Sequence, residues 1–93
     1  MSILKTSVDF SGQAVFVRTV TYAFTGRVKL IDADWVVLDD AAWIADSGRW
    51  AEALATGELS EVEPYPDGQT TCLSRGAIVE ITTWPHDLPR ETK

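Results

Sequence analysis

The chain has 93 residues, a length typical of one domain. Hydrophobic residues make up 45% and charged residues 24% of it, which excludes an intrinsically disordered composition. The formal net charge is −6, and residues 32–67 carry ten of the fourteen acids but one of the eight basic residues. This acidic balance disfavours nonspecific binding to nucleic acid, which needs lysine and arginine against phosphate.

Cysteine usage and hydropathy bear on the compartment. The one cysteine, Cys72, cannot form an intrachain disulfide, which fits a reducing cytoplasm. No stretch approaches the roughly 20 apolar residues of a membrane span, and no apolar run typical of a signal peptide follows the first residues. We therefore expect residues 1–93 to form a single cytoplasmic domain without a membrane contact.

The N-terminal third predicts two strands after a leader over residues 1–13. Residues 14–18 are rich in β-forming side chains and predict the first strand. Residues 20–30 alternate with a period of two, which predicts a long, half-buried antiparallel strand. Gly26 within it predicts a bulge or sharp bend. The apolar face of this alternation consists of Val20, Tyr22, Phe24, Val28 and Leu30.

A turn and a third strand come next. The aspartates of residues 31–34 predict a tight turn, because their side chains bond to nearby backbone groups. Residues 35–38 then predict a third strand, which residues 39–44 extend or end.

Residues 45–69 change character and predict an insertion. Asp46 or Ser47 is expected to cap a short helix that stops at Gly57. Apolar residues at helical spacing predict that one face of this helix packs against the protein. These residues are Trp50, Ala53 and Leu54. Residues 58–66 are acidic and contain prolines, so we expect a surface loop there.

The C-terminal part predicts two more strands, over residues 70–74 and 77–84, joined at a tight Arg75-Gly76 corner. Pro85 ends the last strand, and residues 86–93 are expected to form a loosely ordered, flexible tail. The predicted fold is therefore mainly β: a small, strongly bent, five-stranded antiparallel barrel of SH3-like shape. A short helix is inserted between strands three and four.

Two blocks of sequence resemble those of the Sm-like (Lsm) family. The segment from Gly26 to Asp32, followed by Val36 to Ala41, is similar to the first block, and Leu73 to Ile81 is similar to the second. The insertion helix looks more like a group of small proteins of phages and mobile elements. The counterparts of that group's features are Arg18-Thr19, Gly26, Trp43-Ile44 and Ser47 to Thr56.

This resemblance implies a homo-oligomeric ring, in which strand four of one subunit pairs with strand five of the next. The family's ligand loops correspond to a small set of residues here, and others are expected at the subunit or partner interface. The ligand-binding candidates are Trp35, Arg75, Gly76, Arg27 and Lys29, and the interface candidates are Trp50, Leu73 and Ile78. The base-reading asparagine of RNA-binding Sm proteins has no counterpart, because the chain contains no asparagine and Trp35 or Val36 falls at that place.

Each candidate also has a plainer interpretation. We expect most of the four tryptophans to pack in the core or an interface, with Trp35 as the best candidate for stacking on a base. The aspartates between 32 and 40 lack the spacing of a calcium loop. Cys72 and His86 could form a nucleophile pair, but Cys72 lies in the middle of a predicted strand with no activating neighbour in the sequence, and we expect it to be a small buried side chain.

No phosphate-binding loop or nucleophile motif occurs, so neither enzyme activity nor a cofactor is expected. The sequence favours a noncatalytic, ring-forming accessory protein of phage or mobile-element origin that binds a nucleotide-like ligand or a protein partner. The alternative is an RNA-binding Sm-like protein.

Overall fold

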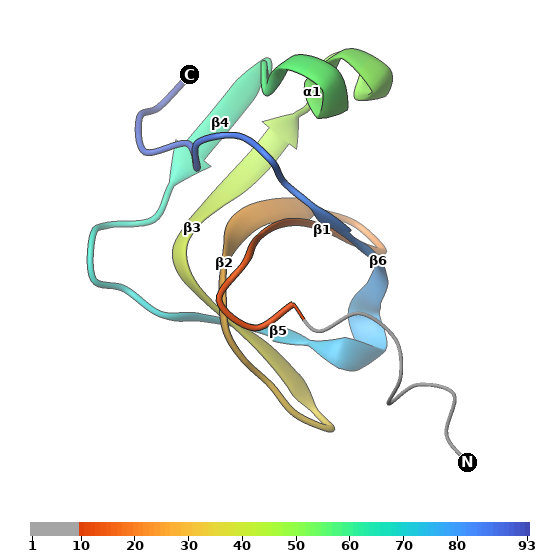
Figure 1. Ribbon diagram of the computed structural model, residues 1–93, viewed down its shortest axis with the longest axis vertical. Coiled ribbons are helices and arrows are strands. Elements are labelled where there is room, and N and C mark those ends of the chain that lie inside the picture. Colours follow the sequence, from red (N-terminus) through yellow and green to blue (C-terminus); the bar gives the residue numbers. More distant parts are fainter. Residues whose placement is uncertain (1–9) are drawn as a thin grey trace.

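A computed structural model describes residues 10–93, so residues 1–9 of the expected leader lie outside the description. The described chain is mainly β, with one short helix beside a strongly curved sheet (Figure 1). Its elements are β1 (Ala14–Thr19), β2 (Ala23–Ile31), β3 (Trp35–Asp46), α1 (Trp50–Thr56), β4 (Glu61–Pro64), β5 (Thr71–Ser74), the 3-10 turn η2 (Arg75–Ala77) and β6 (Ile78–Thr83).

The six strands form one antiparallel sheet around the long strand β3. One side of β3 pairs with β2, and β1 and β6 follow beyond β2. The other side of β3 is shared: its first residues pair with β5 and its last residues with β4. The prediction of a five-stranded barrel therefore needs correction, because the sheet has six strands and does not close.

Curvature enters at Gly26, as the sequence predicts. The pairing of β2 with β3 shifts register between Thr25 and Arg27, the signature of a β-bulge. Gly26 is buried, and a Cβ atom placed on it would lie 3.0 Å from both Cβ and Cδ1 of Leu38. A glycine is needed here because β3 passes so close.

The concave face of the sheet holds the inner core. Phe24 and Val28, on the predicted apolar face of β2, are buried in it, whereas Val20, Tyr22 and Leu30 are exposed. The predicted strand was therefore too long, since Val20 lies in the turn before β2 begins at Ala23. The inner core consists of Val15, Val17, Phe24, Val28, Val36, Leu38, Ala41 and Leu73.

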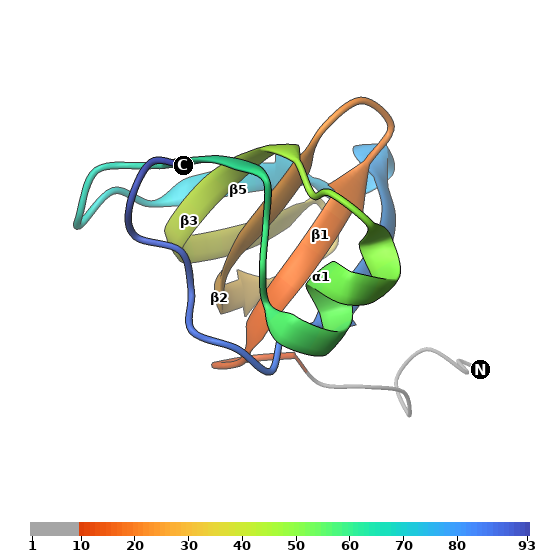
Figure 2. The same ribbon diagram turned by 90° about the horizontal axis from the view of Figure 1, so that it is seen from above.

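A second core covers the outer face of the same sheet. Figure 2 shows α1 lying across β1, where Trp50 packs on Phe16 with ring centroids 4.5 Å apart. The predicted apolar face of the helix is confirmed, because Ala53 is buried and Trp50 and Leu54 pack against this core. The outer core consists of Phe16, Ala42, Ile44, Ala53, Leu59, Val62 and Trp84.

The two ends of α1 differ in how well the sequence predicts them. Gly57 adopts φ 81°, the left-handed conformation of a C-terminal glycine stop, as expected. The predicted N-terminal cap is wrong: Arg49 occupies that position without a side-chain capping bond. Asp46 instead accepts a hydrogen bond from the N–H of Gly48 at 2.8 Å and so shapes the turn before the helix.

The expected surface loop over residues 58–66 contains the strand β4, which pairs with the end of β3. Val62 of β4 is 2% exposed and supplies a side chain to the outer core.

The C-terminal segment from His86 has no regular secondary structure, yet hydrogen bonds tie it to the sheet. Arg90 donates to the carbonyls of Ala41 at 3.1 Å and Tyr65 at 2.9 Å. The backbone N–H and C=O of Lys93 both bond to Val62 at 2.9 Å, so Lys93 covers the outer edge of β4. The insertion and the tail together therefore cover the outer face.

Candidate functional site

The turn after β2 and the corner after β5 meet at one place, where three of the five predicted ligand-binding residues lie. Asp32 Oδ1 accepts the N–H groups of Asp34 and Trp35, both at 2.8 Å, which closes the turn. Arg75 donates its backbone N–H to Asp34 O at 2.9 Å and its Nη1 to Asp32 O at 2.6 Å. Trp35, Arg75 and Gly76 are thus brought together, and Trp35 is 47% exposed.

The charge of this turn works against an anionic ligand. The N–H groups of Asp34 and Trp35, helped by the nearby Arg75 guanidinium, lower the pKa of Asp32 below its ordinary value of 3.8. Asp32 therefore stays an anion beside Trp35 at neutral pH, with Asp34 next to it. The guanidinium of Arg75 is already engaged with a backbone carbonyl, which leaves it less available to a phosphate.

The other predicted basic residues lie further along β2. Arg27 is opposite Asp39 in the register of β2 and β3 and donates to Gly12 O at 3.1 Å, while Lys29 is exposed. Trp35, in contrast, pairs with Ser74 of β5. Arg27 is therefore engaged with the leader and is not part of the Trp35–Arg75 arrangement.

The three predicted interface residues differ in accessibility. Leu73 is 8% exposed and packs in the inner core of its own chain, so its side chain is not available to a partner. Ile78 is half-buried against the same core, and Trp50 is half-buried against the outer core. Their backbone positions differ too, because Leu73 and Ile78 lie on β5 and β6, whereas Trp50 begins α1.

A groove that the sequence did not reveal lies beside the N-terminus of α1. Its volume is about 690 Å³, within the range of small-molecule binding sites. Two segments form it, one from the β1–β2 turn and one from the end of β3 to α1. Its aromatic residues are Phe16, Tyr22, Trp43 and Trp50, and its charged residues are Arg18 and Asp46.

The register of the sheet explains why these two segments meet. Ala23 of β2 pairs with Ile44 of β3, which brings the turn before β2 beside the end of β3. The rings of Tyr22 and Trp43 then meet edge to face, with centroids 5.8 Å apart. We name the space lined by Phe16, residues 18–23, residues 43–47 and Trp50 the aromatic groove. No feature of the sequence signals this groove, because Val20 and Tyr22 fit the apolar face of the predicted strand and their exposure is seen only in the structure.

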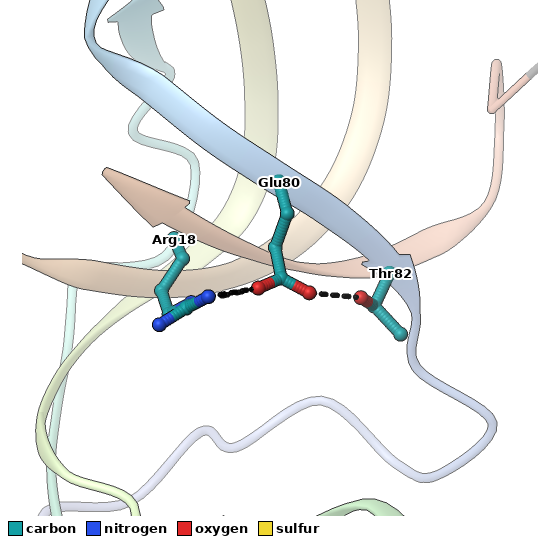
Figure 3. A network of polar contacts seen from close by, with 3 residues as sticks. All are labelled: Arg18, Glu80 and Thr82. Carbon is teal, nitrogen blue, oxygen red and sulfur yellow. Dashed lines mark hydrogen bonds and ion pairs between the residues drawn. The ribbon is translucent and has the colours of Figure 1, made fainter. Parts of the chain in front are cut away.

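The cation of the aromatic groove is already neutralised. Arg18 on β1 donates from Nε to Glu80 Oε1 on β6 at 2.8 Å and forms an ion pair with it. The other oxygen of Glu80 accepts a hydrogen bond from Thr82 at 3.3 Å, so Glu80 is held between both residues (Figure 3). Asp46 forms no ion pair within the described part of the chain.

Cys72 and His86, which were considered as a nucleophile pair, have different surroundings in the structure. Cys72 is exposed on β5, which corrects the expectation that it is buried. The His86 ring instead lies 2.7 Å from Leu54 O and contacts Trp84, with centroids 4.9 Å apart. Among residues 10–93, no three histidine, cysteine or carboxylate side chains gather as a metal site would require. No helix in that range is long and apolar enough to cross a membrane.

Comparison of the chain with protein families, with curated proteins and with solved structures finds no match.

Proposed function

We propose that the chain is a noncatalytic, self-assembling accessory protein with an Sm-like fold, whose copies join edge to edge into a ring. The observation that supports this proposal is that β5 and β6 each have one unpaired edge among the described residues. In the described part of the chain, β5 pairs with β3 alone and β6 with β1 alone. Each strand therefore presents one row of backbone N–H and C=O groups to another molecule.

Within residues 10–93, no lysine, proline or covering segment protects these two edges, and Glu80, the one charged residue on them, is held by Arg18 and Thr82. Proteins commonly place lysine, proline or a covering segment on an exposed edge. Neither β5, with the sequence TCLS, nor β6, with IVEITT, contains lysine or proline. The outer edge of β4, in contrast, is covered by Lys93. Val79 on β6 is also 59% exposed, which adds an apolar side chain to the unprotected edge.

Pairing β5 of one copy with β6 of the next is a head-to-tail contact. Such a contact gives a ring when the rotation between copies closes and a filament when it does not. The strand path β6-β1-β2-β3-β5 and the bend at Gly26 agree with the Sm-like resemblance, which favours closure. Backbone pairing of this kind needs little from side chains, so the buried Leu73 is no obstacle.

The test uses one lysine on each edge, Val79→Lys on β6 and Cys72→Lys on β5, with the mass measured by light scattering and sedimentation. The unmodified chain is expected to be one oligomer, and each variant alone a monomer. A mixture of the two variants should form a dimer and nothing larger, because one intact β5 can meet one intact β6. An unmodified chain that stays monomeric at high concentration, or a mixture that stays monomeric, contradicts the proposal.

RNA binding remains a second candidate because the exposed Trp35 lies beside the Arg75-Gly76 corner, where a base could stack. An RNA binder should lose affinity steeply with salt and on changing Arg27, Lys29 or Arg75 to alanine. The charge of Asp32 and Asp34 makes this the weaker candidate. Electrophoretic mobility shifts with single-stranded oligonucleotides decide it, and no shift at low salt would exclude it.

A further inference from the structure

We propose that the aromatic groove binds an extended segment of a partner protein that carries a lysine or arginine between apolar side chains. This site goes beyond self-assembly, since neither β5 nor any residue of β6 lines it. Three features of the described residues favour such a partner: the exposed aromatic side chains, the sign of the charge, and the open shape between two segments.

Exposed apolar and aromatic side chains gather at the groove. Tyr22 is 55% exposed and the neighbouring Val20 is 76% exposed, and both line the groove. Trp50 and Trp43 are half-buried there. Tyrosine and tryptophan in a partly dry pocket are the residues that most often dominate binding between proteins. The groove therefore has the composition of a binding surface.

The charge around the groove selects a cation. Arg18 is held by Glu80, as Figure 3 shows, so it leaves no net positive charge at the rim. Asp46 lines the groove and lies opposite Glu61 of β4, and within residues 10–93 neither carboxylate forms an ion pair. The groove therefore offers a lysine or arginine side chain both aromatic rings and the carboxylate of Asp46 as contacts.

The shape favours a peptide segment. The groove lies between the β1–β2 turn and the chain entering α1, and its volume of about 690 Å³ accommodates several side chains. An anionic ligand would meet the carboxylate of Asp46, and the one cation that lines the groove among residues 10–93, Arg18, is already held by Glu80. An extended segment with one basic residue and apolar neighbours therefore fits the lining better than a nucleotide.

The experiment selects a phage-displayed library of random dodecapeptides on the immobilised full chain. Enriched peptides are then synthesised, labelled and titrated by fluorescence polarisation at low and high salt. We expect enrichment of sequences with lysine or arginine flanked by apolar residues. Asp46→Asn keeps the oxygen that accepts the Gly48 N–H, and it should weaken binding about two- to fivefold.

The matched control is Asp40→Asn, which removes the same charge from the same strand outside the groove. It should leave affinity unchanged. Tyr22→Ala, at an exposed position, should weaken binding about two- to fivefold, and Trp50→Ala should weaken it more. Because Trp50 also packs on Phe16, the Tyr22 variant remains decisive if the Trp50 variant does not fold.

The outcomes separate this proposal from self-assembly. Val79→Lys should still bind the peptides, since it changes a strand edge outside the groove. No enrichment, enrichment of peptides without basic residues, or equal affinity of the Asp46→Asn and Asp40→Asn variants would each overturn the proposal. Loss of oligomers with retained peptide binding would leave it standing.

Discussion

Replacing Gly26 by alanine should destabilise the fold through one identifiable contact. The added Cβ would lie 3.0 Å from both Cβ and Cδ1 of Leu38 and 3.3 Å from the carbonyl oxygen of Asp39. Leu38 is fully buried in the inner core, and Asp39 O belongs to the backbone of β3. Neither neighbour can move without disturbing the sheet, so β2 and β3 must separate locally.

The expected cost follows from two opposing terms. Adding a methyl group to a packed core costs about 1–3 kcal/mol. A glycine-to-alanine change recovers about 0.4–1 kcal/mol by restricting the unfolded chain. The free energy of unfolding should therefore fall by about 1–2 kcal/mol. For a domain of this size, each kcal/mol lowers Tm by about 4–8 °C.

Urea denaturation followed by tryptophan fluorescence measures this change, and Gly76→Ala is the matched control. A Cβ on Gly76 would meet Ser74 Oγ at an ordinary 3.8 Å, so that variant should be at least as stable as the unmodified chain and gain up to about 1 kcal/mol. The double variant Gly26→Ala with Leu38→Ala tests the contact itself. Its cost should be smaller than the sum of the single costs by at least about 0.5 kcal/mol. A Gly26→Ala variant as stable as the unmodified chain, or strictly additive costs, would refute the reasoning.

Three further changes test other features. Thr25 is fully buried and its hydroxyl has no hydrogen-bond partner within the described residues, so Thr25→Val should raise the free energy of unfolding in urea by up to about 1 kcal/mol; a decrease would show an unseen partner. Arg90→Ala removes the bonds to Ala41 O and Tyr65 O and should lower that free energy by about 1–3 kcal/mol, with faster amide exchange of Lys93; unchanged stability would mean that the tail does not need this anchor. Because the folded pKa of Asp32 is lowered, its charge stabilises the protein above its ordinary pKa of 3.8, and this contribution is lost as pH falls through the lowered value. The Tm difference between the unmodified chain and Asp32→Asn should therefore close in that acidic range, and a constant difference would contradict it.

Local chemistry made some features predictable. The aspartate turn before β3, the glycine bend in β2 and the glycine stop of α1 each depend on a few neighbouring residues. β4 was missed because its sequence, EVEP, has two acids and a proline and reads as a loop. Proline is tolerated on an edge strand, and pairing with β3 supplies what propensity does not.

Of the two candidate sites, the sequence predicts one and misses the other. Trp35 and Arg75 could be expected together, because each sits at a turn whose place in the strand order the sequence indicates. The aromatic groove could not be predicted, because its two segments meet only through the register of β2 and β3, in which Ala23 pairs with Ile44. Tyr22 fits the alternation of a buried strand but lies before β2 begins. Periodicity alone does not say where a strand ends.

The two-sided sheet links these misreadings to the proposed binding site. The alternation of apolar and polar residues along β2 predicts that one face of the strand is exposed to solvent. Thr25 on that face is nevertheless fully buried beside Phe16 and Ala42. The outer face carries apolar side chains, so it needs the insertion and the tail as a cover. That cover ends at Trp50, and the remaining surface towards the β1–β2 turn is the aromatic groove. A bound segment would therefore extend the outer core over the part that α1 leaves open, which is why its apolar residues should matter as much as its charge.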